Sequence, residues 1–160
     1  MVIWKITPTL EQLNQISQGS IHDSLGIEFT EVGESYLEAK MPVDSRTHNP
    51  VGILHGGASV VLAESLGSIA SILVTGLGTG PVTGLAAGPK EFRAVGLEIN
   101  ASHLRSVKTG TVYGRATPVR IGKTIHVWNI QVRESENLDS PTVCICRLTV
   151  MIQLSGNQLP

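Results

Sequence analysis

One segment limits the possible folds of this chain more than any other: the apolar run from Ala58 to about Thr75. At ~1.5 Å per residue, it would form a helix of roughly 27 Å. A helix this apolar must be covered on most of its faces. Glu64, Gly67 and several serines interrupt the run, which argues against a membrane span and favours a helix buried against a sheet.

Segments that alternate polar and apolar residues flank this run and predict β-strands. Two come before it, at residues 26–31 and 35–41, and four come after it, at residues 94–104, 110–117, 124–133 and 142–154. Turn residues at 108–110, 120–123 and 135–141 fit hairpins, so we expect the last four strands to form an antiparallel meander. Thr9 and Gln12 have capping-box spacing and predict a short N-terminal helix.

The order of these elements predicts an α+β fold, in which one curved antiparallel sheet wraps the long helix. The length of 160 residues, with 41% hydrophobic and 16% charged residues, fits a single globular domain over residues 1–160. The first residues, Met1-Val2-Ile3-Trp4-Lys5, lack the pattern of an export signal, so we expect a cytoplasmic protein.

The formal net charge of −1 argues against nucleic-acid or membrane binding through bulk charge. The charges are nevertheless unevenly distributed. Up to Glu64 there are eight acidic and three basic residues, whereas the stretch from Ile99 to Arg133 has six basic residues and no acidic one. The six are Arg105, Lys108, Arg115, Arg120, Lys123 and Arg133. This stretch could bind an anion.

Glu64 is the only charged residue between His55 and Lys90. An ionised carboxylate in such apolar surroundings costs several kcal/mol unless it is paired, so Glu64 needs either a partner or a chemical role. Ser68, Ser71 and Thr75 follow it at helical spacing and predict a polar stripe suited to a cleft. The alternative is a structural carboxylate that pairs with a buried base or bonds across a subunit interface.

Gly56 and Gly57 stand where the long helix would begin. Glycine there lets a ligand approach the unpaired backbone N–H groups of the first turn, where the helix dipole also favours negative charge. This arrangement suits an oxyanion hole. Taken alone, the glycines could form a simple turn, and His55 could be a structural histidine. The proximity of all three to Glu64 favours a catalytic interpretation.

Three segments carry a resemblance to a known family. They are Met41-Pro-Val-Asp-Ser-Arg-Thr, Gly52-Ile-Leu-His-Gly-Gly-Ala-Ser-Val-Val-Leu-Ala-Glu-Ser, and Val95-Gly-Leu-Glu-Ile-Asn-Ala-Ser-His-Leu-Arg-Ser. Together they resemble the hotdog-fold thioesterases of the PaaI-like group, above all those that act on 1,4-dihydroxy-2-naphthoyl-CoA in menaquinone synthesis or proofread the enterobactin pathway. The resemblance covers nearly the whole chain and is most specific in the His-Gly-Gly-Ala-Ser segment.

The resemblance implies an acyl-CoA thioesterase and assigns roles to individual residues. Glu64 is then the nucleophile or general base, and Gly56 donates its backbone N–H to the thioester oxygen. His55 supports binding of that oxygen, and Ser68 positions water or Glu64. Asn49 stands where close relatives have glutamine and is one methylene shorter, so it would polarise the carbonyl only if its loop moved inward.

The resemblance also implies how coenzyme A is held and how the chain assembles. The residues that match CoA-binding segments are Gly96, His103, Leu104, Arg105, Ser106, Arg120, Ile121, Gly122, Lys123, Thr124 and Ile125. Most of them lie in the stretch without acidic residues, which is an independent reason to expect phosphate binding there. We expect a homodimer with active sites at its seam, doubled to a homotetramer. We expect no metal and no cofactor, since coenzyme A is part of the substrate.

The acyl group is the least determined feature. The resemblance favours an aromatic group, including 1,4-dihydroxy-2-naphthoyl, whereas the aromatic content of only 4% leaves medium-chain acyl groups open. The segment from Gly76 to Arg93 is about a dozen residues longer than in these relatives and could reshape the acyl pocket. Two other functions remain as alternatives, a hotdog dehydratase or hydratase and a non-catalytic module that binds acyl-CoA.

Overall fold

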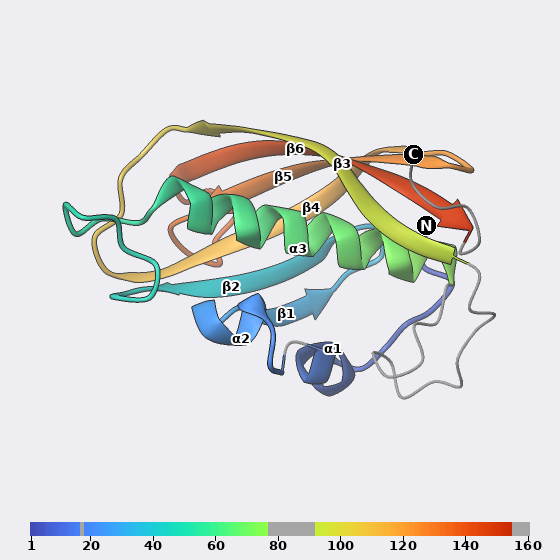
Figure 1. Cartoon of the computed structure of the whole chain (residues 1–160), viewed down its shortest axis with the longest axis horizontal. Helices are drawn as coiled ribbons and strands as arrows, with labels where there is room; N and C mark the ends of the chain where they lie inside the picture. The colour runs from blue at the N-terminus through green and yellow to red at the C-terminus, as the bar shows by residue number, and fades with distance from the viewer. Residues whose placement is uncertain (17, 77–91, 155–160) are drawn as a thin grey trace.

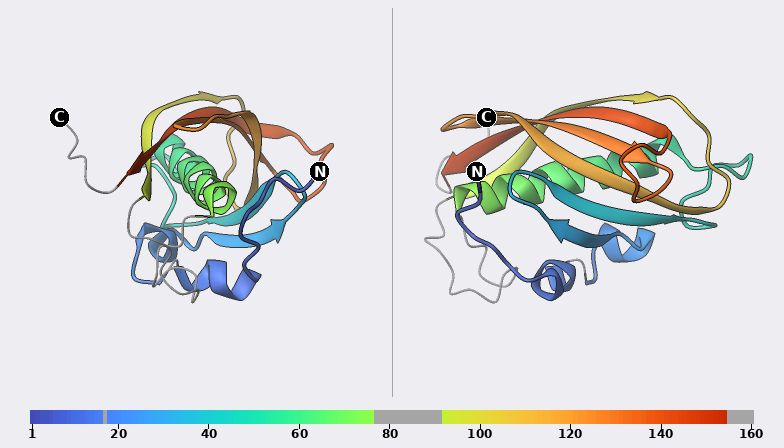
Figure 2. Two further views of the ribbon diagram at one scale, coloured as in Figure 1. Left: turned by 90° about the vertical axis from the view of Figure 1, so that its right-hand side faces the viewer. Right: turned by 180° about the vertical axis from the view of Figure 1, so that it is seen from behind.

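The computed structural model of the chain describes residues 1–16, 18–76 and 92–154. At its centre, helix α3 (Gly56–Thr75) lies in the concave face of an antiparallel sheet that has six strands among these residues (Figure 1). The strands are β1 (Glu28–Val32), β2 (Leu37–Val43), β3 (Phe92–His103), β4 (Gly110–Ile121), β5 (Ile125–Arg133) and β6 (Thr142–Leu154). A view along the helix shows the sheet curving around it, which confirms the predicted α+β arrangement (Figure 2, left).

Helix α3 is covered mainly by the sheet. Its side chains Leu62 and Leu66 are completely buried. A Cβ atom at Gly67 would lie only 2.5 Å from Leu148 Cδ2, so glycine at this position allows β6 to approach the helix closely. Among the described helices, α3 alone is long and apolar enough to cross a membrane, and 67% of its most apolar window is buried inside the protein. This burial supports the core-helix interpretation.

The predicted meander of four strands is wrong for its first member. The strand order is β1-β2-β4-β5-β6-β3, so β3 pairs with β6 at the edge of the sheet and not with β4. The predicted hairpin at 108–110 therefore does not form, whereas those at 120–123 and 135–141 join β4 to β5 and β5 to β6. The segment after β3 bonds to other parts of the chain and does not turn back on β3. Leu104 N–H donates to the carbonyl of Val143 on β6, and the carbonyl of Val107 accepts the N–H of Leu54 before α3, each at 2.8 Å.

Two short helices precede the sheet. Helix α1 (Leu10–Ile16) begins with the predicted capping box, in which the Thr9 N–H bonds to the Gln12 side chain at 2.9 Å. Helix α2 (Ile21–Leu25) was not predicted, because five residues are too few to establish a helical period. Most of the long segment from 76 to 93 lies outside the described residues, so its expected effect on the acyl pocket stays a prediction.

The two edges of the sheet are covered differently. Along β1, the side chain of Asn14 accepts from the N–H of Phe29 at 2.8 Å and donates to its carbonyl at 3.1 Å. Helix α1 thereby occupies hydrogen-bonding groups that an edge strand would otherwise present to another chain. No described segment pairs with the outer edge of β3, which is 12 residues long.

Candidate active site

The loop before α3 is fixed by the side chain of Asn49. Its Oδ1 accepts hydrogen bonds from the N–H groups of Val51 at 3.1 Å and Ile53 at 3.3 Å. The backbone N–H of Asn49 also donates to the Ile53 carbonyl at 2.8 Å. Asn49 Oδ1 thus holds the turn that leads into the helix. Only the side-chain N–H groups of Asn49 are left to polarise a thioester carbonyl.

His55 is the N-cap of α3. Its Nδ1 accepts the backbone N–H of Gly57 at 2.8 Å, so the neutral ring carries its proton on Nε2. The His55 carbonyl accepts the N–H groups of Ala58 at 3.0 Å and Ser59 at 3.3 Å. The exposed ring therefore organises the first turn of the helix, a structural role that was the alternative for this residue.

Gly56 is left as the free donor of that turn. The N–H groups of Gly57, Ala58 and Ser59 are all engaged with His55, while the N–H of Gly56 has no partner among the described residues. A Cβ atom at Gly56 would lie 2.7 Å from Nε2 of His103, so glycine here leaves room beside that ring. An unpaired N–H at the positive end of a 20-residue helix is suited to receive developing negative charge.

The carboxylate of Glu64 is half-buried two turns further along α3. Ser68, one turn beyond, donates its hydroxyl hydrogen bond to Glu64 Oε1 at 2.8 Å, as its spacing predicted. Gly96 on β3 faces the same oxygen, and a Cβ atom there would lie 3.2 Å from it. Gly96, expected to bind substrate, therefore borders the carboxylate directly.

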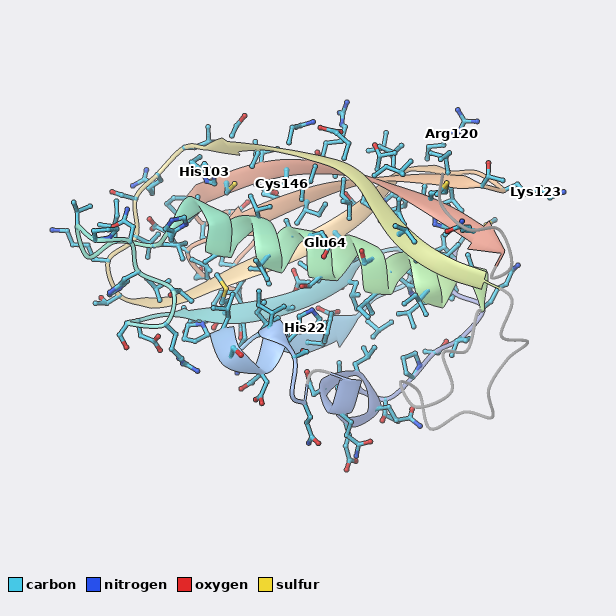
Figure 3. The ribbon with its side chains drawn as sticks, viewed as in Figure 1. His22, Glu64, His103, Arg120, Lys123 and Cys146 are labelled. Carbon is cyan, nitrogen blue, oxygen red and sulfur yellow. The ribbon has the colours of Figure 1, made fainter. Side chains whose placement is uncertain are left out.

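His22 was not predicted as a site residue, and its helix α2 packs on α3, which carries Glu64. Figure 3 shows His22 on α2 below the carboxylate of α3. Burial lowers the pKa of His22, and the negative charge of Glu64 opposes this effect. No sequence signal marked His22, since it stands in a five-residue helix far from Glu64 in the chain.

The predicted polar stripe on α3 is divided in two. Glu64 and Ser68 form a pair at the half-buried face, whereas Ser71 is completely buried and accepts a hydrogen bond from Trp128 Nε1 at 2.8 Å. Thr75 donates to the backbone carbonyl of Ser71 at 3.0 Å. The stripe is therefore a site only over its first half, and its second half belongs to the core.

The residues expected to hold coenzyme A fall into two separate groups. His103, Leu104, Arg105 and Ser106 are exposed near the start of α3, while the turn from Arg120 to Ile125 lies at the far end of the fold (Figure 3). The turn borders a cavity of about 590 Å³ beside the last turn of α3. One chain alone does not bring the two groups together.

The cavity beside the turn combines apolar walls with polar groups. Its lining includes the aliphatic residues Ile3, Val74, Ile121 and Ile152 together with Lys5, Lys123 and His126. His126 is 1% exposed, and its Nδ1 has no hydrogen-bond partner in the part of the chain that the structure describes. Burial lowers the pKa of His126, opposed by a hydrogen bond to the Gly122 backbone. A neutral imidazole with a free acceptor nitrogen can receive an N–H or O–H from a ligand.

The hypothesis that the basic stretch from Ile99 to Arg133 binds an anionic ligand does not hold for two of its six basic residues. Arg115 Nε and Arg133 NH2 lie 2.6 and 2.7 Å from Glu38 Oε1, and the Arg133 side chain is 1% exposed. These two arginines therefore neutralise a buried carboxylate of the chain itself. Arg105 Nε lies 3.7 Å from Glu134, which leaves Lys108, Arg120 and Lys123 as exposed cations without an ion pair among the described residues.

A free N–H at a helix start and an unneutralised carboxylate on the same helix are the two groups that acyl transfer requires. The curved sheet wrapped around one long helix is the hotdog fold of known thioesterases. A thioesterase from Haemophilus influenzae superposes with a TM-score of 0.83 at 43% identity, covering 99% of this chain and 100% of that one.

Three further matches give the family. The model of the thioesterase superfamily matches residues 51–140. The 1,4-dihydroxy-2-naphthoyl-CoA hydrolase of Escherichia coli is 44% identical over 94% of this chain and 98% of its own length. The proofreading thioesterase EntH of Cronobacter turicensis is 42% identical over the same shares of the two chains. The chain belongs to the thioesterase superfamily and is a thioester hydrolase.

Proposed function

We propose that this protein hydrolyses acyl-CoA thioesters, with the Gly56 N–H of one chain and the Glu64 carboxylate of a second chain acting on the same carbonyl. The observation that carries this proposal is the pair of groups on α3: one N–H at its first turn and one carboxylate that have, respectively, no acceptor and no cation among residues 1–16, 18–76 and 92–154. The N–H would hold the thioester oxygen as negative charge develops on it, and the carboxylate would act at the carbon.

The spacing of the two groups supports a shared site. Gly56 and Glu64 are eight residues apart, which corresponds to about 12 Å along a helix. Both must come within roughly 3–3.5 Å of the same carbonyl group, so one helix cannot supply both. Two antiparallel copies of α3 side by side would bring each Gly56 toward the other chain's Glu64.

The free edge of β3 supports such a pairing. Leu97 and Leu104, within β3 and just after it, are 50% and 58% exposed. Gly96, which borders Glu64, lies on this same strand. Antiparallel pairing of β3 with its copy would cover the edge and continue the sheet across a dimer, which could double to a tetramer.

Two chemical routes fit this geometry. In one, a Glu64 oxygen attacks the thioester carbon, the C–S bond breaks, and the CoA thiolate takes a proton from solvent. Water then cleaves the mixed anhydride, which releases the acid and restores the carboxylate. In the other, Glu64 removes a proton from an attacking water, and the departing thiolate receives a proton as the C–S bond breaks. Oxygen-18 from solvent in Glu64 after a single turnover would favour the anhydride.

Neither route requires a metal or a separate cofactor, since coenzyme A enters with the substrate. In a dimer of this kind, the turn from Arg120 to Ile125 of one chain would approach the exposed segment His103–Ser106 of the other. Lys123 and Arg120 would then meet phosphate groups of the nucleotide, and the free Nδ1 of His126 could accept an amide N–H of the pantetheine arm.

For the acyl group, the similarity to the E. coli 1,4-dihydroxy-2-naphthoyl-CoA hydrolase supports an aromatic substrate over a medium-chain one. A panel of aromatic and aliphatic acyl-CoAs, ranked by kcat/KM, tests this choice. An aliphatic substrate at the top of the ranking would overturn the aromatic assignment while leaving the thioesterase activity in place.

The shared site has its own test in mixed dimers. Glu64→Gln removes the carboxylate, and Gly56→Pro removes the N–H at the first helical position, where the backbone suits proline and the added Cβ must displace only the exposed ring of His103. If each site uses one group from each chain, a mixed dimer of the two inactive variants has one intact site, so random mixing should restore about a quarter of native activity. If both groups act within one chain, mixing restores nothing. Light scattering on the native protein should show a dimer or tetramer, and an active monomer would contradict the proposal.

A further inference from the structure

The start of the chain is fastened across the last turn of α3 (Figure 1). The backbone N–H groups of Lys5 and Ile6 both donate to the carbonyl of Leu73, at 3.0 and 3.2 Å. Trp4 is buried, and its indole ring stacks on that of Trp128 with centroids 6.3 Å apart. These contacts hold the backbone of Lys5 at a defined place beside the end of the helix.

The side chain of Lys5 lies along this helix end. A Cβ atom at Gly76, the C-cap of α3, would lie 3.0 Å from Lys5 Cβ and 3.4 Å from its Cδ, so the aliphatic stem packs on the glycine. Lys5 then borders the cavity of about 590 Å³ that Lys123 borders from the β4–β5 turn. The Lys5 side chain is exposed, and within the described residues its ammonium group has no ion pair.

The cavity is positively charged. Among its lining residues that the structure describes, the titratable ones are Lys5, Lys123 and His126, and none is acidic. His126 is buried, and its Nδ1 has no hydrogen-bond partner in the described chain. Two cations, a free acceptor nitrogen and aliphatic walls suit a ligand that joins an anionic group to an arm with an N–H or O–H.

We propose that Lys5 holds a phosphate group of coenzyme A together with Lys123, so that the start of the chain is part of the substrate site. This inference rests on the proposed function, in which the β4–β5 turn meets the nucleotide. Lys5 lies outside the basic stretch of the sequence and joins Lys123 only in the folded chain. Two cations beside one cavity raise the local positive potential, which attracts phosphate.

A purely structural role is the alternative for Lys5. A cation beside the last turn of a helix is stabilised by the helix dipole. In that case, removal of the charge lowers the urea midpoint and leaves the binding of coenzyme A unchanged. The bonds that fix the segment come from the backbone of Lys5 and Ile6, so a substitution of the Lys5 side chain retains them.

Direct titration tests the contact without turnover. Lys5→Met removes the charge and keeps an unbranched apolar stem, and Lys5→Arg keeps the charge. By calorimetry, the Kd of free coenzyme A should rise about three- to tenfold in Lys5→Met and stay near the native value in Lys5→Arg. Pantetheine, which has no phosphate, should bind both variants as it binds the native protein. Lys40→Met, which removes a charge on β2, is the control and should bind coenzyme A normally.

The kinetic consequence should appear in KM alone. In Lys5→Met, KM for acyl-CoA should rise by the same factor of about three to ten with kcat nearly unchanged, because a phosphate contact is made equally in the ground state and the transition state. The same acyl group on pantetheine should be hydrolysed with native kcat/KM. An equal loss on both substrates would overturn the role of Lys5 in phosphate binding, as would a lowered urea midpoint with native affinity for coenzyme A.

The outcomes separate this inference from the proposed function. Native affinity for coenzyme A in Lys5→Met overturns the role of Lys5 alone, because hydrolysis by the native protein is measured independently. A native protein that binds coenzyme A but hydrolyses no acyl-CoA overturns the proposed function. The titration with free coenzyme A then still decides whether Lys5 holds a phosphate.

Discussion

Two carboxylates on neighbouring elements of the core have opposite surroundings. Glu38 on β2 is 7% exposed, and two guanidinium groups contact its Oε1, from Arg115 at 2.6 Å and Arg133 at 2.7 Å. Glu64 on α3 is half-buried, and among the described residues the one hydrogen bond to its carboxylate comes from the Ser68 hydroxyl at 2.8 Å. Among the described residues, no ion pair reaches Glu64.

The difference indicates what each charge is for. A carboxylate held by two arginines has its charge balanced and its oxygens occupied, so it serves structure. A carboxylate with one hydroxyl partner keeps lone pairs available for attack or for proton transfer. The fold therefore neutralises one acid and leaves the other reactive, and each prediction below tests one side of this contrast.

The largest expected effect is on stability, at the structural acid. Glu38→Gln leaves two arginines beside an uncharged group, and breaking a buried ion pair typically costs about 3–5 kcal/mol. We expect the free energy of unfolding, measured by urea titration, to fall by an amount of this order. The kcat of the protein that remains folded should change little. A loss of stability below about 1 kcal/mol would show that Glu38 is not the stabilising centre described here.

The reverse pattern is expected at the catalytic acid. Glu64→Gln keeps the shape and the hydrogen bond with Ser68 but removes the nucleophile or base, so kcat should fall at least ~10²-fold. Substrate binding and the urea midpoint should remain near native values, because no ion pair is broken. Steady-state kinetics and urea titration on the same preparation separate the two effects. Retention of most activity in the folded variant would contradict the mechanism.

The positions of helices and strands were predictable where the local sequence pattern determines them. Local pattern predicts the capping box at Thr9 and the long helix. It also predicts both ends of five of the six strands to within two residues, because side-chain periodicity acts over a few residues. The partner of β3 was not predictable in this way, since β6 begins 39 residues after β3 ends and β4 follows at once. Strand order depends on pairings over long sequence separations, which periodicity does not encode.

A smaller effect distinguishes the two halves of the polar stripe on α3. Ser68→Ala removes the one described hydrogen bond to Glu64, so kcat should fall about three- to tenfold, in line with roughly 0.5–1.5 kcal/mol for such a bond. Stability should hardly change. Ser71→Ala is the matched control on the same helix, since it leaves the buried Trp128 N–H unpaired. It should lower the free energy of unfolding by about 1–3 kcal/mol and leave kcat unchanged. Equal effects from both variants would remove the distinction between site and core.

The active site was only partly predictable for the same physical reason. Glu64, Ser68, His55 and Gly56 lie within one helix and its cap, so their spacing alone indicates their proximity. Arg115 and Arg133 were assigned to an anion-binding stretch, because their partner Glu38 lies 77 and 95 residues away in the sequence. The packing of His22's helix α2 on α3 was not predicted, because it arises from tertiary structure alone. Composition shows which charges a chain has, and the fold decides which of them remain unpaired.

The smallest expected effect per residue concerns the cations that stay exposed. Arg115 and Arg133 are committed to Glu38, whereas Arg120 and Lys123 project from the β4–β5 turn beside the cavity. Exposed charge pairs are worth roughly 0.2–1 kcal/mol each, so removing both Arg120 and Lys123 should raise KM for acyl-CoA about three- to tenfold and leave kcat nearly intact. Raised salt should reproduce part of this increase, because ions screen exposed charges.

The control for these cations is a substrate without the nucleotide. The same acyl group on a short pantetheine-type thiol carries no phosphates, so the double variant should hydrolyse it with native kcat/KM. Lys40→Ala, which removes one exposed charge from β2 that pairs with Glu28 at 3.0 Å, should leave KM unchanged for both substrates. If the double variant loses as much on the short thioester as on the CoA ester, the turn does not serve the nucleotide. Arg120 and Lys123 would then be a solvated surface, and the contrast would hold only for the two carboxylates.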